Sequence, residues 1–227
     1  FCHTTTVTSN KIYNHLNPIR VANGKDLYYP APGNDMRLGF RNIDENFIQD
    51  KPAGNPLSTA FINDGILVET VTGSGFPLGQ GGVSFNFINS ISNNFVNSIN
   101  HIGILQWGYQ LSLLTHYING NTINLRSYPL VPNFKAGLHT LNNLQMVNTY
   151  NNLTGFGTAA LQNNHVGYVS AFNANQRIFC NYTNNVYTGF QFHVANPATQ
   201  WTVNYMSNGH YRGLQMVNSA AIGDQGS

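Results

Sequence analysis

Apolar and polar residues alternate along much of the chain after about residue 60, which is the pattern of a β-strand with one buried face. The clearest example is residues 105–113, where leucine, tryptophan or tyrosine occupies every second position. The alternating segments end at turn sequences such as Asn119-Gly120, so we expect neighbouring segments to pair as hairpins. Two more hairpins are expected around residues 173–176 and 207–209. The chain is therefore predicted to be all-β, an antiparallel β-sandwich or a jelly-roll-like barrel.

Residues 85–105 show a different pattern. Apolar residues recur there at spacings of three and four, which is the period of an amphipathic α-helix, at Ile88, Ile91, Phe95, Ile99 and Ile102. The intervening asparagines and serines are poor helix formers. We expect one short amphipathic helix at about 86–102, which covers one end of the sheet.

The first 60 residues differ from the rest of the chain. They hold six of the ten Lys and Arg and five of the nine prolines, and they read as loops joined by short extended pieces. We expect 1–60 to form an extended arm, packed on or exchanged with a main antiparallel β domain at 61–227. Its β-branched start is a candidate self-assembly strand for the open edge of a neighbouring copy, and comprises Thr4, Thr5, Thr6, Val7 and Thr8.

Two short internal similarities occur in the chain. LQMVN is found at 144–148 and again at 214–218, and NNLTGF at 151–156 resembles NNVYTGF at 184–190. Matches this short indicate either two equivalent strands or a coincidence, and they do not establish a repeat architecture.

Acidic residues are missing from the 154 residues between Thr70 and Gly223. Seven of the eight acids lie between Asp26 and Glu69, and the acid-free stretch holds only four Lys or Arg. Most enzyme chemistry at neutral pH uses a carboxylate as acid, base, nucleophile or metal ligand. We therefore expect that the protein is not an enzyme and has no catalytic residue, cofactor or metal.

Charged residues make up only 8% of the chain, which contains 35 asparagines. We expect amides and hydroxyls to supply the polar surface, and such a surface has little of the charge repulsion that keeps copies apart. The ten basic residues are scattered, without the patch that nucleic-acid binding requires. No stretch of 18 apolar residues occurs, so no transmembrane segment is expected.

Candidate metal and catalytic patterns are weak. The eight histidines include no pair at a spacing of two or four, and six of them lie in the acid-free stretch, without a carboxylate nearby in sequence. Structural histidines are the favoured interpretation. The acids Asp44, Glu45 and Asp50 lack the spacing of an EF-hand, so solvated loop charges are favoured. The glycine-rich residues 72–82 lack the lysine of a phosphate-binding loop.

The chain begins at Phe1 and has two cysteines, Cys2 and Cys180. We interpret this start as that of a mature exported protein, secreted or at the cell surface, and the cysteine pair as a disulfide. A disulfide that closes the long loop between Cys2 and Cys180 would stabilise the folded chain by roughly 5 kcal/mol. Two free thiols are the alternative. Glycosylation sequons at Asn152 and Asn181 matter only in a eukaryotic host.

Aromatic residues among amides are the remaining functional candidates, because flat rings stack on sugars while amides bind hydroxyls. Those considered for glycan or partner contact are Trp107, Tyr109, Tyr117, Tyr187, Trp201, Tyr205 and Tyr211. The two tryptophans lie on the apolar phase of their strands, which favours the core. The leading hypothesis is a structural subunit that assembles with copies of itself into a fibre, pilus or surface layer. The alternatives are a carbohydrate-binding module or adhesin that binds surface glycans, and a pore-forming toxin.

Overall fold

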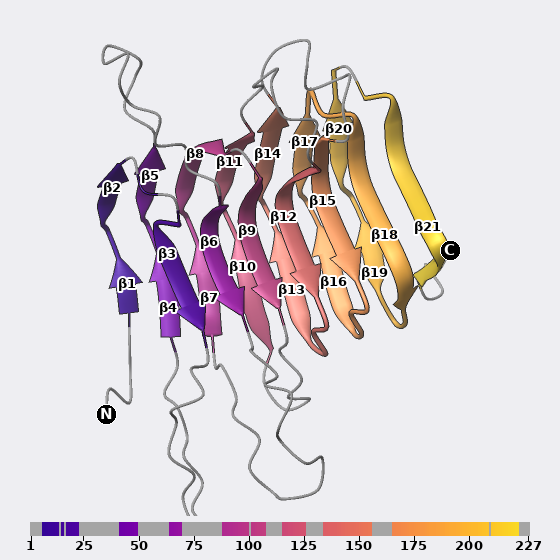
Figure 1. Ribbon diagram of the computed structural model, residues 1–227. Helices are drawn as coiled ribbons and strands as arrows, with labels where there is room; N and C mark the ends of the chain where they lie inside the picture. Colours follow the sequence, from indigo (N-terminus) through magenta and orange to yellow (C-terminus); the bar gives the residue numbers. More distant parts are fainter. Residues whose placement is uncertain are drawn as a thin grey trace, which may run out of the picture.

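The computed structural model describes residues 6–13, 15, 17–22, 41–49, 64–69, 88–99, 101–107, 115–125, 134–155, 165–208 and 210–222. These residues form three β-sheets of seven strands each (Figure 1). Neighbouring strands are parallel in all three sheets. No helix occurs among the described residues.

Each sheet takes every third strand of the chain. Sheet A contains β1 (Thr6–Thr8), β4 (Arg41–Asp44), β7 (Ile88–Ser92), β10 (His116–Asn119), β13 (Met146–Thr149), β16 (Gln176–Phe179) and β19 (Gln200–Thr202). Sheet B contains β2 (Lys11–Tyr13), β5 (Phe47–Gln49), β8 (Phe95–Ile99), β11 (Thr122–Leu125), β14 (Asn152–Gly155), β17 (Tyr182–Asn184) and β20 (Tyr205–Ser207). Sheet C contains β3 (Ile19–Ala22), β6 (Asp64–Glu69), β9 (Ile102–Trp107), β12 (Lys135–Leu141), β15 (His165–Ala171), β18 (Thr188–Asn196) and β21 (Arg212–Ile222).

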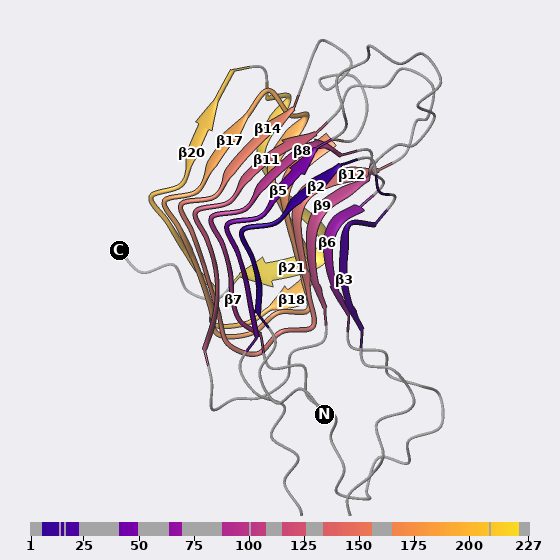
Figure 2. The same ribbon diagram turned by 90° about the vertical axis from the view of Figure 1, so that its left-hand side faces the viewer.

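The chain therefore passes through sheets A, B and C and returns to sheet A one layer further along. This makes a parallel β-solenoid of seven described turns, numbered from turn 1 (β1, β2 and β3) to turn 7 (β19, β20 and β21). The nested ribbons of Figure 2 show successive turns lying over one another around a common interior. The expected antiparallel sandwich or jelly roll is wrong. Alternation correctly indicates that a strand has one buried face, but it carries no information about the direction of the neighbouring strand.

The expected hairpin turns are corners of the solenoid. Asn119 and Gly120 lie where the chain passes from β10 to β11, and Gly120 has a φ of +65°. These two strands belong to different sheets, and each pairs with strands of the turns before and after it. Residues 172–175 likewise lie between β15 and β16, and the second expected turn falls at the end of β20, before β21 begins at Arg212.

The expected helix at about 86–102 is also wrong. Its described part, 88–99 and 101–102, forms β7, β8 and the start of β9. Ile91 is fully buried inside the solenoid, whereas Phe95 stacks on Phe47 of the turn before, with ring centroids 4.9 Å apart. The helix-like spacing thus arises because a two-residue corner shifts the phase of the alternation between two short strands.

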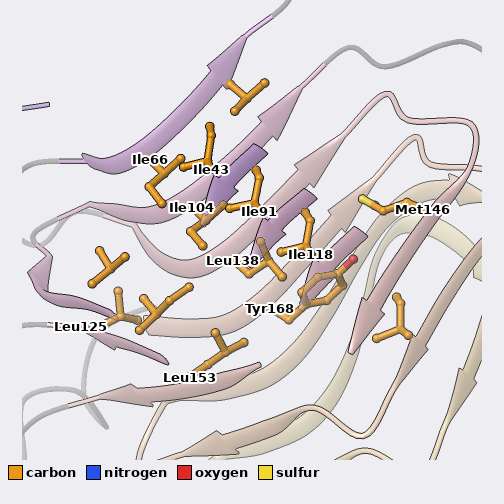
Figure 3. Close-up of a cluster of buried hydrophobic side chains, with 14 of the residues drawn as sticks. Ile43, Ile66, Ile91, Ile104, Ile118, Leu125, Leu138, Met146, Leu153 and Tyr168 are labelled. Carbon is orange, nitrogen blue, oxygen red and sulfur yellow. The ribbon is translucent and has the colours of Figure 1, made fainter. Parts of the chain in front are cut away.

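The interior is built from columns, in which each turn places a residue at the same position. The sheet A column is Val7, Ile43, Ile91, Ile118, Asn148, Ile178 and Trp201. The sheet B column is Ile12, Ile48, Val96, Ile123, Leu153, Thr183 and Met206. The sheet C column is Ile19, Ile66, Ile104, Leu138, Tyr168, Phe190 and Leu214. In turns 2 to 6 every column residue is at most 1% exposed, and Figure 3 shows part of this core.

An asparagine ladder runs along the corner between sheets A and B, and comprises Asn10, Asn46, Asn94, Asn121, Asn151, Asn181 and Asn204. Each of the first six donates its backbone N–H and its Nδ2 to Oδ1 of the next, at 2.9–3.2 Å. The residue before each ladder asparagine has a positive φ, between 49° and 65°. The ladder satisfies backbone groups at a sharp corner, where the regular strand pairing is interrupted.

Five ladder members are at most 1% exposed: Asn46, Asn94, Asn121, Asn151 and Asn181. A considerable part of the asparagine content therefore serves the interior, and the expectation that amides mainly form the surface needs this correction. A second polar cluster lies inside turns 4 to 6, where the Tyr168 hydroxyl bonds Thr140 at 2.9 Å, Asn148 at 2.9 Å and Gln176 at 3.2 Å. Burial raises the pKa of Tyr168 well above its ordinary value, so it remains a donor.

Candidate interaction surfaces

The seventh turn (β19, β20 and β21) exposes positions that are interior in other turns. Met206, Leu214 and Met216 occupy inward columns and are 39–42% exposed. Their counterparts Thr183, Phe190 and Phe192 in turn 6 are completely buried. Within the described residues, no strand pairs with the outer side of these three strands. This end of the solenoid therefore presents an apolar surface bordered by unpaired backbone groups.

The first turn (β1, β2 and β3) forms the opposite edge of the same sheets. Asn10 is the first member of the ladder, and no described residue donates a hydrogen bond to its Oδ1. At the other end, Asn204 Nδ2 donates to the carbonyl oxygens of Ile178 at 2.9 Å and Thr202 at 3.0 Å. One end of the ladder thus has an unused acceptor, and at the other end the Asn204 amide donates only to carbonyl oxygens of its own and the preceding turn. The two ends are complementary in polarity.

Two of the candidate aromatics come together. Tyr187 and Tyr211 stack with ring centroids 4.9 Å apart and an interplanar angle of 15°. The guanidinium carbon of Arg212 lies 5.8 Å from the Tyr187 ring centroid and 5.6 Å from that of Tyr211. Tyr211 is 70% exposed, so this cluster offers a flat ring and a cation to solvent.

The other aromatic candidates lie apart from this pair. Trp201 packs against the core, edge-on to Phe190 at 5.6 Å. Tyr117 of sheet A is 42% exposed, and Tyr205 of the last turn is 57% exposed. Trp107 is half-buried at the end of β9, and Tyr109 lies outside the described residues.

A shallow pocket of about 110 Å³ opens beside the stacked tyrosines, on the side of sheet C. Its lining comprises Phe134, Val166, Tyr187, Thr188, Gln191, Arg212 and Gln215. Gln191 Nε2 donates to Gln215 Oε1 at 2.9 Å, whereas Gln191 Oε1 is buried without a hydrogen-bond partner. The pocket therefore combines an aromatic wall, a guanidinium and two amides, and β18 and β21 position them through the register Thr188–Arg212 and Gln191–Gln215.

One histidine has a carboxylate partner that the sequence did not indicate. Asp64 Oδ1 lies 2.7 Å from His101 Nδ1 and also accepts the backbone N–H of Ile102 at 3.1 Å. The parallel pairing of β6 with β9 brings these residues together across 37 positions. Such a pair can hold the ring of a general base, but in the described part of the chain no hydroxyl or thiol bonds to His101 Nε2. Among the residues that the structure describes, this pair is therefore not accompanied by a nucleophile.

Two buried histidines, His116 and His165, and the half-buried His139 have pKa values that favour the neutral imidazole. Burial lowers the pKa of His116 from 6.5 to about 3, despite an opposing backbone hydrogen bond with Gln145. Burial also lowers the pKa of His139 to about 4, with smaller contributions from His193 and His101. The pKa of His165 falls to about 4 through burial and the nearby Lys135. These shifts report a low-polarity environment, in which the charged imidazolium is disfavoured.

The acidic residues that were considered as metal ligands have structural roles where the structure describes them. Asp44 accepts hydrogen bonds from Ser90 and Ser92, and Glu45 accepts one from Ser9. Asp50 lies outside the described residues. Among the described residues, no three His, Cys, Asp or Glu side chains are grouped to hold a metal.

The expected disulfide also stays a prediction. Cys180 is half-buried at a corner, with a φ of +54°, and Cys2 lies outside the described residues. The sequon residue Asn181 is buried and uses its Nδ2 in the ladder, whereas Asn152 is exposed. Glycosylation of the folded chain would therefore be restricted to Asn152.

The candidate assembly strand is only partly described. Thr4 and Thr5 lie outside the described residues, whereas Thr6–Thr8 form β1, which pairs with β4 of the same chain. The division of the chain at about residue 60 stays a prediction, and β1 to β5 belong to the same sheets as the later strands.

Two further findings bear on the class of protein. None of the described elements is a helix that could cross a membrane. Comparisons with protein-family models, with curated proteins and with solved structures gave no match. The fold is a parallel β-solenoid, a class that does not by itself define a function.

Proposed function

We propose that this chain is an extracellular structural subunit that associates end to end with copies of itself, without catalysis, to form a fibre, pilus or surface layer. The observation that carries the proposal is the exposure of inward-column side chains in the last turn. Leu214 and Met216 would be buried if another turn lay over β21. Burying an aliphatic side chain of this size contributes about 1.5–3 kcal/mol.

The edge strand lacks the features that keep edge strands apart. β21 is 11 residues long, contains no proline, and carries one charged residue, Arg212. Natural edge strands are commonly short, or are protected by lysines, prolines or bulges. The register shift between β18 and β21 lies after His193, so most of β21 remains regular. A long and nearly uncharged edge favours pairing with another strand.

The other end supplies a suitable partner. A first turn placed over the seventh turn of another copy would continue all three sheets in the parallel sense. Asn204 Nδ2 could then donate to Asn10 Oδ1, as each ladder asparagine donates to the next within the chain. Contact between unlike ends does not close into a dimer, so it extends into a filament.

The alternatives are less well supported. In a pore-forming toxin the amphipathic segment at residues 85–105 would be the inserting element, but its described part belongs to β7, β8 and β9 of the solenoid. Glycan binding is favoured by one specific site, the pocket beside Tyr187 and Tyr211.

Sedimentation velocity over a range of protein concentrations tests the proposal. We expect species larger than the 25.1 kDa chain, growing with concentration. The double variant Leu214→Lys/Met216→Lys should sediment as a monomer, because it places charges on the apolar end surface. Val217→Lys is the matched control, since it adds a lysine to the outward side of the same strand. A parent chain that stays at 25.1 kDa at every concentration contradicts the proposal. So does equal association of a double variant whose circular dichroism is native.

A further inference from the structure

We propose that the pocket beside Tyr187 and Tyr211 binds an acidic saccharide, with Arg212 recognising the carboxylate of a uronic acid unit. The inference does not rest on end-to-end association. The pocket opens on the side of sheet C, but Tyr211 belongs to the last turn, so a copy placed over β21 would also approach the outer face of its ring.

The tyrosine pair provides the platform. Tyr211 is 70% exposed, and Tyr187 supports it from behind by near-parallel stacking at 4.9 Å. A ring fixed in this way loses little conformational freedom when a ligand covers its outer face. The C–H face of a pyranose is flat and apolar, and the phenol hydroxyls stay in water. The pair therefore suits a sugar ring.

Arg212 gives the site its charge selectivity. Its guanidinium lies against both rings, and within the described residues it has no ion pair. No acidic residue occurs between Thr70 and Gly223, so no carboxylate close in sequence competes for it. A guanidinium binds a planar carboxylate through two parallel hydrogen bonds, and such charge-assisted bonds are about twice as strong as neutral ones.

The two glutamines provide the polar wall. Gln215 Oε1 accepts from Gln191 Nε2 at 2.9 Å, which fixes the Gln191 amide group. Gln191 Oε1 is buried and has no hydrogen-bond partner. A ligand hydroxyl that donates to this oxygen would therefore satisfy a buried acceptor and displace no existing hydrogen bond of the oxygen.

The size of the pocket limits the ligand. A volume of about 110 Å³ is well below the range of about 300–1,000 Å³ that is typical of enclosed ligand sites. The site can therefore hold one acidic unit of a longer chain that continues over the surface. We expect weak binding by a single copy, strengthened where several copies contact one polysaccharide.

Isothermal titration with tetragalacturonate, and with its fully methyl-esterified form, tests the inference. The two probes share the sugar rings and differ in charge. We expect the acid to bind about tenfold more tightly than the ester at low salt, and added salt to reduce this preference. Arg212→Gln should abolish the preference, Tyr211→Ala should weaken binding of both probes, and Tyr211→Phe should retain it. Tyr117→Ala, at an exposed tyrosine of sheet A, is the matched control and should bind like the parent.

The inference is overturned if acid and ester bind equally, if Arg212→Gln keeps the preference, or if neither probe binds at millimolar concentration. Arg212 and Tyr211 are exposed, and native circular dichroism of each variant is required for its result to count. Sedimentation of the same samples separates the two proposals, because a monomeric chain can still bind the acid, and an associating chain can fail to bind it.

Discussion

Turn 5 (β13, β14 and β15) and turn 7 share one design but differ in their surroundings. Both have an inward sheet B residue, a ladder asparagine and a glycine in sheet C. In turn 5 these are Leu153, Asn151 and Gly167, and the two side chains are completely buried between turns 4 and 6. In turn 7 they are Met206, Asn204 and Gly213, with described neighbours on one side only. A solenoid turn completes its core only when another turn covers it. The same substitution is therefore expected to reduce stability more in turn 5 than in turn 7.

The largest contrast is expected for the ladder. Asn151 accepts two hydrogen bonds from Asn121 and donates to Ile118 and Asn181, all in a buried environment. Asn151→Ala leaves these groups without partners, and we expect a loss of about 4 kcal/mol in the free energy of unfolding. Asn204→Ala should cost about 1 kcal/mol, because its neighbours can reach water.

Urea unfolding followed by circular dichroism measures both losses. Asn152→Ala, at an exposed position next to the ladder, is the control and should change stability little. Similar losses for Asn151→Ala and Asn204→Ala would refute the distinction between inner and terminal turns.

The next largest effect is a loss of folding stability at low pH. His116 of turn 4 is buried, with a pKa of about 3, whereas the unfolded chain binds that proton near pH 6.5. Between these two pH values the unfolded state binds more protons than the folded state. The stabilisation of the fold by a neutral His116 is therefore complete above about pH 6.5 and is lost as the pH falls. We expect a loss of about 3 kcal/mol between pH 7 and pH 4, to which His139 and His165 add.

Urea midpoints at pH 7, 5 and 4 measure this loss. His116→Gln should reduce the pH dependence, and Met146→Leu, at the paired position in β13, should retain it. If His116→Gln leaves the pH dependence unchanged, the imidazole is not the group that titrates.

The smallest contrast is between two glycines. A Cβ at Gly167 would lie 2.7 Å from the carbonyl oxygen of Gly189 and 2.6 Å from Thr183 Cγ2. At Gly213 the nearest atom is Met206 Sδ at 3.0 Å, on a flexible side chain. We expect Gly167→Ala to cost about 2 kcal/mol and Gly213→Ala about 0.5 kcal/mol or less. Thermal unfolding of both variants checks this, and a greater loss for Gly213→Ala would contradict it.

The sequence predicted strands, corners and an all-β class, but not their arrangement. The intervals between ladder asparagines are 36, 48, 27, 30, 30 and 23 residues, so no fixed period exposes the repeat. A signal was nevertheless present. Each turn contains a six-residue motif, in which an inward sheet A residue is followed three positions later by asparagine and five later by an inward sheet B residue. Ile118, Asn121 and Ile123 are one example.

The short similarities noted in the sequence do not correspond to this repeat. LQMVN at 144–148 ends in β13 of sheet A, whereas its second copy at 214–218 lies in β21 of sheet C. The match is therefore coincidental, and direct comparison of short words leads away from the true register.

The candidate site could be predicted only in part. Tyr187 and Tyr211 were among the aromatic candidates, but they are 24 residues apart, and only the parallel pairing of β18 with β21 brings them together. The same offset aligns Gln191 with Gln215. Asp64 and His101 show the same limitation, because contacts between turns depend on the register of the turns.

Head-to-tail cross-linking tests the proposed association most directly. Ser9 and Val203 occupy the corner column at the two ends, and Cys180 already stands in that column. Stacked turns place such residues about 4.8 Å apart, within the Cα separation of a disulfide of about 4.4–6.8 Å. The test uses Ser9→Cys/Val203→Cys in a chain in which Cys2 and Cys180 are serine. We predict that mild oxidation yields a reducible ladder of covalent dimers, trimers and longer species, while each single-cysteine variant gives no cross-linked species. Dimers formed by Ser9→Cys alone, or no cross-linking of the double variant at concentrations where the chain associates, would contradict the account.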